Sequence, residues 1–239
     1  MENEILFSIV TVCFNSEKTI RDTIQSVICQ KYTNYEYLIV DGASKDSTLN
    51  IVQSFNDPHI KLISEPDQGV YDAMNKGLAM AEGDYVLFLG SDDLLYNENV
   101  LSSVANYIQD PSCHVYYGDV IKKKKGNRYD GEFNKIKWGY ENICHQSVFY
   151  PKYVYKSHMY DLRYKLVADW VYNLILLSEN IEFRYIHLII SEYNDCDGVS
   201  STKDDALFLK NRRSLVVSAV GLIPYLGGLI IKACRLILK

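Results

Sequence analysis

Several features that would assign a class directly are missing from this chain of 239 residues. Its six cysteines include no CxxC pair, so we expect no zinc site, and their apolar surroundings predict reduced, buried thiols in a cytosolic protein. The net charge of −5 argues against bulk binding of nucleic acid. The amino terminus shows no basic region and no cleavage site, which predicts that no secretory signal is present. No glycine-rich loop with basic residues, which a nucleotidyltransferase needs for its triphosphate, occurs near residues 8–18.

The composition that is present suits a globular enzyme or binding domain. The hydrophobic content of 48% and the charged content of 23% predict one large α/β domain with an appendage. Tyrosine is frequent, at 20 residues, and aromatic side chains suit sugar faces. Lys122 to Lys125 form a basic cluster directly before Gly126, which predicts a solvated hairpin tip, with a lipid or phosphate contact as the alternative.

Helical and extended segments alternate along the chain. We expect strands at 7–15, 37–41, 60–64, 84–89, 115–120, 147–150 and 183–190, helices at 20–28, 46–55, 70–81, 99–109 and 167–177, and loops at 122–145 and 191–203. Ser16 is a candidate cap for the first helix. This βα order predicts a doubly wound α/β sheet.

Polar side chains follow three of the expected strands. The strand at 84–89 runs into Asp92 and Asp93, the strand at 37–41 ends at Asp41, and the first strand ends at Asn15. Ligands of open α/β sheets bind at the carboxyl ends of the strands, so these groups predict a nucleotide pocket. Two carboxylates there can hold a divalent cation, and the cation can hold a diphosphate. The alternative is that Asp92 and Asp93 cap a following helix.

The carboxyl-terminal segment is apolar and flanked by cations. Residues 215–231 are apolar or small except for two, with Arg212-Arg213 before them and Lys232, Arg235 and Lys239 after them. The run is short for crossing a bilayer, and Pro224 interrupts it. It predicts a helical segment on the membrane interface, and the alternative is a terminal helix packed on the domain or in a dimer.

Four motifs together resemble those of family 2 glycosyltransferases, over about residues 5–180. They are Phe14-Asn15, the run from Val40 to Thr48, the run from Gly69 to Gly77, and the DxD-like run from Phe88 to Asp93. The resemblance implies a GT-A fold: a mainly parallel nucleotide-binding sheet flanked by helices, with a carboxyl-terminal apolar helical tail. It implies a GT-A domain over 1–205, with a nucleotide-sugar half at 1–110 and an acceptor half at 111–205, followed by the segment 206–239.

The same resemblance implies a donor site. Asp41 would accept hydrogen bonds from a base edge, Phe14 and Asn15 would line the base and ribose, and Asp92 would meet Mn²⁺ or Mg²⁺ with support from Asp93. The full set implied for the nucleotide-sugar is Phe14, Asn15, Asp41, Ser44, Asp67, Asp72, Asn75 and Ser91.

It also implies a catalytic base. Asp169 corresponds to the base that takes the proton from the acceptor hydroxyl, in a single displacement that inverts the anomeric configuration. The alternative for Asp169 is a helix cap. His145 and Gln146 would lie near the acceptor or the pyrophosphate, and the alternative for His145 is a loop histidine that makes one hydrogen bond.

Three positions depart from the family pattern. Gly42 and Gly90 stand where relatives commonly carry an acid. Asp41 alone would therefore hold the nucleotide base, and the metal site would have fewer carboxylates. Ala168 replaces a common glutamate and leaves Asp169 as the expected base.

The sequence therefore predicts an inverting hexosyl- or N-acetylhexosaminyl-transferase. The expected donor is a nucleoside diphosphate sugar, foremost a UDP-sugar, and the expected acceptor is a hydroxyl of a glycan or a lipid-linked molecule. We expect the enzyme at the cytoplasmic face of the cell membrane, in bacterial surface polysaccharide biosynthesis, without nucleic acid and with an oligomer left open. The rivals are a nucleotidyltransferase and a non-catalytic nucleotide-binding or scaffold module of an envelope assembly complex.

Overall fold

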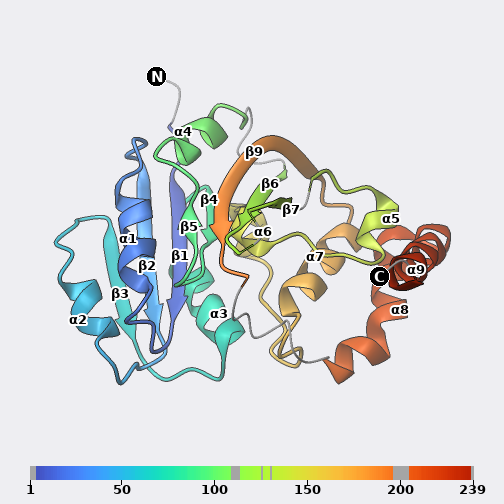
Figure 1. The fold of residues 1–239 in the computed structure, drawn as a ribbon, viewed down its shortest axis with the longest axis horizontal. Helices are drawn as coiled ribbons and strands as arrows, with labels where there is room; N and C mark the ends of the chain where they lie inside the picture. Colours follow the sequence, from blue (N-terminus) through green and yellow to red (C-terminus); the bar gives the residue numbers. More distant parts are fainter. Residues whose placement is uncertain (1–3, 109–113, 125, 130, 196–204, 238–239) are drawn as a thin grey trace.

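The structure, a computed structural model, describes residues 4–108, 114–124, 126–129, 131–195 and 205–237 (Figure 1). The amino-terminal elements are β1 (Phe7–Cys13), α1 (Ile20–Ile28), β2 (Tyr35–Asp41), α2 (Thr48–Gln53), β3 (Ile60–Ser64), α3 (Val70–Met80), β4 (Tyr85–Phe88), β5 (Leu94–Leu95) and α4 (Val100–Ala105). They are followed by β6 (Val115–Lys122), β7 (Arg128–Tyr129), α5 (Lys135–Trp138), the 3-10 turn η1 (His145–Ser147), β8 (Val148–Pro151), α6 (Lys152–Tyr155), α7 (Ala168–Ser178), β9 (Phe183–Tyr193), α8 (Ala206–Val220) and α9 (Leu222–Ile237).

One mixed sheet runs through the described residues in the order β3-β2-β1-β4-β8-β6-β9-β5, with β7 paired to β6. The strands β3, β2, β1 and β4 are parallel, whereas β8 is antiparallel to both β4 and β6. Alternate residues of a strand face opposite sides of a sheet. In β1, Ile9 accordingly belongs to the core cluster that contains residues of α1 and α4, and Val10 to the cluster that contains residues of α3 and α7. The sheet is thus buried between two layers of helices, as expected for this fold class.

Most of the predicted elements are confirmed within two to four residues, and the exceptions have local causes. The helix expected at 99–109 ends at Ala105, and its last residue, Gln109, lies outside the described residues. The loop expected from 191 was wrong at its start, because Ser191, Glu192 and Tyr193 pair with β6 and extend β9; residues 196–203 lie outside the described residues. The first helix is preceded by Thr19 rather than Ser16, whose carbonyl accepts from the amides of Thr19 and Ile20.

The carboxyl-terminal segment forms two helices that break at Gly221, where φ is 91°. Within α8, Phe208, Val216 and Val220 are buried, and the helix packs against α7. The next helix, α9, packs against α5 and α8 but leaves Leu222, Ile223, Leu226 and Ile230 exposed. Figure 1 shows this pair at the end of the molecule opposite to α1 and α2. Among the described residues, no helix has both the length and the apolar character needed to cross a membrane.

The cysteines only partly match the expectation of buried thiols. Of the four that the structure describes as free, Cys13 is buried, Cys144 is intermediate, and Cys29 and Cys234 are exposed. Burial, reinforced by the neighbouring Asp41 carboxylate, raises the pKa of Cys13 to about 12. This thiol is therefore inert at neutral pH.

Candidate active site

The carboxyl ends of β1, β2 and β4 are tied together by side chains that follow each strand. The Asn15 amide donates to Ser44 Oγ at 2.8 Å, and Asn15 Oδ1 accepts from the Lys45 amide at 2.8 Å. The hydroxyls of Ser16 and Ser91 lie 2.9 Å apart and join the β1 and β4 ends. Asn15 has a φ of 51°, in the left-handed region that asparagine tolerates better than most residues. Three polar strand ends predicted from the sequence thus meet at one edge of the sheet.

Asp41 is fully buried at this edge. Its Oδ2 accepts from the Ser44 amide at 3.0 Å and from Ser64 Oγ at 2.7 Å, and its Oδ1 accepts from Ser44 Oγ. The carboxylate therefore holds the loop between β2 and α2, and contact with a base remains a prediction. Phe14, whose side chain is 61% exposed, is instead the open group at the end of β1.

The segment before α3 contributes another carboxylate to the same place. Asp67 Oδ1 accepts from the Gly69 amide at 2.8 Å, and the other side of its carboxylate lies over Gly42, next to the Phe14 ring. Asp72 Oδ2 accepts from the Gln68 amide at 2.9 Å and so stabilises the turn into α3.

The Asn75 side chain forms hydrogen bonds with the backbone of another segment of the chain. Its Nδ2 donates to the Tyr160 carbonyl at 2.9 Å and its Oδ1 accepts from the Tyr160 amide at 2.8 Å. The structure therefore places Asn75 in a link between α3 and the segment after α6, and its predicted role at the nucleotide-sugar rests on the resemblance alone.

Asp92 and Asp93 lie in the turn between β4 and β5. Asp93 is almost fully buried, with Oδ2 accepting from Gln146 Nε2 at 2.7 Å and Oδ1 from the Asn194 amide at 2.8 Å. Asp92 Oδ2 accepts from Asn194 Nδ2 at 2.9 Å. Because a strand follows them, neither acid caps a helix. Burial, together with the charge of Asp92, raises the pKa of Asp93 to about 6.

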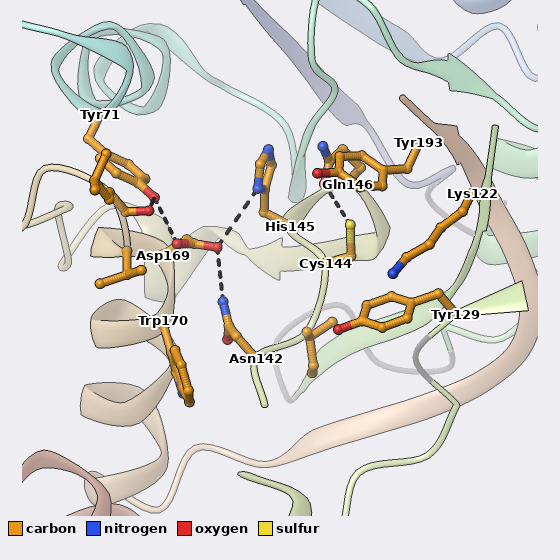
Figure 2. A pocket seen from close by; sticks show the side chains of 13 residues that line it. Tyr71, Lys122, Tyr129, Asn142, Cys144, His145, Gln146, Asp169, Trp170 and Tyr193 are labelled. Atoms are coloured by element: carbon orange, nitrogen blue, oxygen red, sulfur yellow. Dashed lines mark hydrogen bonds and ion pairs between the residues drawn. The ribbon is translucent and has the colours of Figure 1, made fainter. Parts of the chain in front are cut away.

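A cavity of about 280 Å³ opens beside this turn (Figure 2). Asp169, in the first turn of α7, points into it, and its two oxygens accept from Tyr71 Oη at 2.8 Å and from Asn142 Nδ2 at 2.9 Å. His145 Nδ1 lies 3.8 Å from Asp169 Oδ2. Because these side chains hold the carboxylate, the helix-cap alternative for Asp169 does not describe it. Burial and the neighbouring Asp169 carboxylate raise the pKa of Tyr71 far above its usual range, so its hydroxyl stays a proton donor.

The other end of the cavity is aromatic and carries a cation. Lys122 Nζ lies 3.7 Å from the centroid of the Tyr129 ring, a cation–π contact, and Tyr193 and Cys144 complete this end (Figure 2). Lys122 was predicted to lie in a solvated hairpin tip. The hairpin is present between β6 and β7, but Lys122 itself lines the cavity, and Lys125 lies outside the described residues.

Trp170 joins the cavity to the carboxyl-terminal helices. Its ring packs on Phe208 of α8 with centroids 4.8 Å apart, and the Arg212 guanidinium lies 5.7 Å from the Trp170 centroid. Asp205 caps α8 and also accepts from the Leu166 amide at 3.2 Å. α8 therefore supports the segment that carries Asp169.

Residues 8–170 match the protein family described as Glycosyl transferase family 2. The chain belongs to this family. It is 38% identical over 214 residues to the PGL/p-HBAD biosynthesis glycosyltransferase of Mycobacterium tuberculosis, covering 86% of this chain and 83% of that protein. It is 35% identical over 111 residues to the putative teichuronic acid biosynthesis glycosyltransferase TuaG of Bacillus subtilis, covering 45% of this chain and 44% of TuaG.

Solved structures agree with the fold expected of this glycosyltransferase. Residues 1–349 of Staphylococcus aureus TarS in complex with UDP-GlcNAc give a TM-score of 0.70 at 18% identity, covering 90% of this chain and 67% of that one. The mannosyltransferase PcManGT of Pyrobaculum calidifontis, in complex with GDP-Man and Mn²⁺, gives 0.67 at 12% identity, covering 100% and 77%. The predicted GT-A fold is thereby confirmed.

The glycosyltransferase site also contains residues that the sequence did not single out. Tyr71 lies in the run from Gly69 to Gly77 and could have been identified there, as the polar aromatic residue at the start of α3. Asn142 and Asn194 carry no motif, and they reach their carboxylates across 27 and 102 positions of sequence. Lys122 was visible only as part of a basic run.

Proposed function

We propose that this glycosyltransferase transfers a sugar from a nucleoside diphosphate sugar to a hydroxyl of a glycan or a lipid-linked acceptor, with inversion. One observation carries the proposal. Asp169 opens onto a cavity of about 280 Å³ while two neutral donors hold its carboxylate, and the same cavity reaches Gln146, which bonds Asp93. Asp169 is thus connected to the strand-end acid pair through a residue that lines the same cavity, which supports its role as a base close to the departing diphosphate.

In this proposal the donor lies across the strand ends and the acceptor lies in the cavity. Phe14 and Asp67 contact the base and ribose, with Asp41, Ser44 and Asn15 shaping the loop behind them. The acceptor hydroxyl gives its proton to Asp169 as its oxygen attacks the anomeric carbon, and the nucleoside diphosphate leaves from the opposite face. His145 and Gln146 lie between the two halves.

The residues present fit a divalent cation that keeps water and phosphate ligands. Within the described residues, no three His, Cys, Asp or Glu side chains gather closely enough to hold an ion by themselves. Both Asp93 oxygens accept hydrogen bonds, whereas Asp92 is partly exposed and accepts from Asn194 among the described residues, so Asp92 would hold Mg²⁺ or Mn²⁺ with Asp93 behind it. One or two carboxylates plus phosphate oxygens are a usual set for Mg²⁺. The cation would stabilise negative charge on the departing diphosphate.

The proposed donor is a UDP-sugar, and the proposed process is assembly of a bacterial surface polysaccharide or glycolipid at the inner face of the membrane. The names of similar proteins support this proposal, because two of them are glycosyltransferases of teichuronic acid and PGL/p-HBAD biosynthesis. A structural neighbour, TarS, is in complex with UDP-GlcNAc. In this arrangement residues 1–110 bind the donor, 111–205 bind the acceptor, and 206–239 contact the membrane.

The first test is a thermal-shift panel of UDP, GDP and dTDP, each with and without Mn²⁺. A specific nucleotide at 100 times its Kd stabilises a protein by about 2.7 kcal/mol, which is easily measured. We expect one diphosphate to stabilise the wild type in a metal-dependent way and Asp92→Ala to lose the metal-dependent part. Asp22→Ala, at an exposed acid of α1, is the control and should bind like the wild type. If no nucleotide raises the melting temperature of the wild type, the proposed catalytic function is wrong and a non-catalytic scaffold is the better assignment.

A further inference from the structure

A chain of hydrogen bonds runs from the protein interior to the carboxylate of Asp169. Asn142 Nδ2 donates to Asp169 Oδ2 at 2.9 Å, Asn173 Nδ2 donates to Asn142 Oδ1 at 2.9 Å, and Tyr150 Oη donates to Asn173 Oδ1 at 2.8 Å. Tyr150 comes from β8, Asn173 from α7 and Asn142 from the loop before η1. Every donor in this chain points toward the carboxylate.

The surroundings of these hydrogen bonds favour donation in the direction from Tyr150 to Asp169. Burial, with the nearby Tyr172 and the Asp169 charge, raises the pKa of Tyr150 well above its usual range, so its hydroxyl keeps its proton. Asn173 and Tyr150 are buried, so water does not compete for their polar atoms. If Asn173 and Asn142 turned over, Asn142 would present its oxygen to the carboxylate, and two acceptors would face each other.

We propose that Tyr150, Asn173 and Asn142 form a positioning relay that directs hydrogen-bond donors to the Asp169 carboxylate and keeps it aimed into the cavity. The inference rests on the proposed role of Asp169 as the base. Hydrogen bonds donated to a carboxylate favour its charged form, and a chain of such bonds polarises along its length. Residues that touch neither substrate thereby set the orientation of the group that takes the acceptor proton.

Other groups also face Asp169 and must stay constant in a test. Tyr71 Oη donates to Asp169 Oδ1, and His145 Nδ1 lies 3.8 Å from Asp169 Oδ2. The buried Tyr160 interacts electrostatically with the Asp169 carboxylate. Lys122 lines the same cavity. Tyr150→Phe leaves all four in place, because it removes one hydroxyl at the far end of the relay.

Tyr172 provides a matched control. It precedes Asn173 on α7, its ring centroid lies 5.3 Å from that of Tyr150, and both side chains are buried. In the part of the chain that the structure describes, the Tyr172 hydroxyl has no hydrogen-bond partner. Tyr172→Phe therefore removes the same atom from the same region without touching the relay.

The first readout is the pH profile of UDP-glucose and UDP-GlcNAc hydrolysis, with water as the acceptor. Tyr150→Phe should lower kcat on the order of tenfold at pH 6 and less at pH 8, because the acidic limb of the profile moves to higher pH. KM for the nucleotide sugar should not change. Asn173→Asp should cost more than Tyr150→Phe, since it replaces the donor to Asn142 with an acceptor and turns the Asn142 amide over. Tyr172→Phe should match the wild type.

The second readout needs no activity. The loss of melting temperature caused by Tyr150→Phe should shrink in an Asp169→Ala background, because the relay then has no carboxylate to orient. The effect of Tyr172→Phe should simply add to that of Asp169→Ala, as it does for uncoupled sites.

The two proposals can fail separately. If Asp169→Asn still hydrolyses the nucleotide sugar, Asp169 is not the base, and the comparison of melting temperatures in the two backgrounds would still test the relay. If Asp169→Asn is inactive but Tyr150→Phe behaves like Tyr172→Phe in both readouts, the relay is wrong.

Discussion

Gly42 and Gly90 each lie beneath a carboxylate of the proposed donor site. A Cβ at Gly42 would overlap with Asp67 Oδ2, and a Cβ at Gly90 would overlap with Asp93 Oδ2. Both positions are those where the family resemblance leads one to expect an acid. The chain instead has glycine there, and the carboxylate of Asp67 lies over Gly42 and that of Asp93 over Gly90.

This arrangement predicts a large effect from a small substitution. Gly42→Ala should push the Asp67 carboxylate aside and raise the Kd of the preferred nucleoside diphosphate about tenfold, since a hydrogen bond to a charged group is worth roughly 1.5–3 kcal/mol. Isothermal titration would measure it. Gly227→Ala, on α9, serves as the control, because an added Cβ there meets only the Ile136 side chain of α5 at ordinary contact distance. An unchanged Kd in a Gly42→Ala protein of normal melting temperature would remove Asp67 from the donor site.

Sequence reasoning identified single residues best where an acid follows a strand or opens a helix. Asp92 and Asp93 were proposed that way, whereas Asp169 came from the family resemblance; the structure puts Asp169 at a cavity and links Asp93 to that cavity through Gln146. Asn142 and Lys122 were not found, because an asparagine in a loop and a lysine in a basic run look the same whether or not the fold turns them toward a cavity. Tertiary placement alone distinguishes them.

At the scale of elements, Glu36 of β2 joins segments that are far apart in sequence. It is buried, and it accepts from Ser8 Oγ of β1 at 2.6 Å, from Lys61 Nζ of β3 at 2.7 Å and from the Glu82 amide after α3 at 2.6 Å. Burial alone would raise the pKa of Glu36, but the bonds from Lys61, Ser8 and Glu82 outweigh it, so the pKa is lowered.

A lowered pKa gives a signed prediction for stability. The ionised Glu36 stabilises the fold above the ordinary pKa of 4.5, and this contribution is lost as the pH falls through the lower folded value. Glu36→Gln should therefore reduce the free energy of unfolding by about 1–3 kcal/mol at pH 7 and by less below pH 4.5. Urea unfolding at several pH values measures this. Glu65→Gln, at an exposed acid paired with Lys76, should change little; an equal loss for Glu36→Gln at every pH would contradict the account.

The predicted elements were those whose signal is local. An apolar run that leads to a polar residue marked β1, β2 and β4, and helical patterns marked α1, α3 and α7. In contrast, β5 and β7 have two residues each, and β5 forms only because Leu94 and Leu95 pair with Glu192 and Ser191. β5 thus depends on partners about a hundred positions away, whereas β7 pairs across a hairpin with Val120 and Ile121 of β6, and both strands are too short to leave a pattern of their own.

At the scale of the whole molecule, α8 and α9 combine positive charge with an exposed apolar surface. Residues 206–237 include five basic residues and no acidic one. On α9, Leu222, Ile223, Leu226 and Ile230 recur at helical spacing and stay exposed, with Ile223 at 84% and Ile230 at 65%. A basic amphipathic helix of this kind favours an anionic lipid surface. α8, against which α9 packs, contacts Trp170 of the cavity proposed for the acceptor through Phe208.

If α9 binds lipid, two charges on its exposed face should release the protein. Burying an isoleucine is worth about 1.5–3 kcal/mol, so Ile223→Glu with Ile230→Glu should weaken partition onto phosphatidylglycerol vesicles by more than about a hundredfold. Co-sedimentation would measure it, and added salt should weaken wild-type binding because the flanking cations contribute. Met159→Glu places a charge on a residue that is 54% exposed outside this helix and should sediment like the wild type. Unchanged sedimentation of the double variant would exclude this face. A wild-type dimer that the double variant converts to monomer would show instead that α9 binds a second copy of the chain.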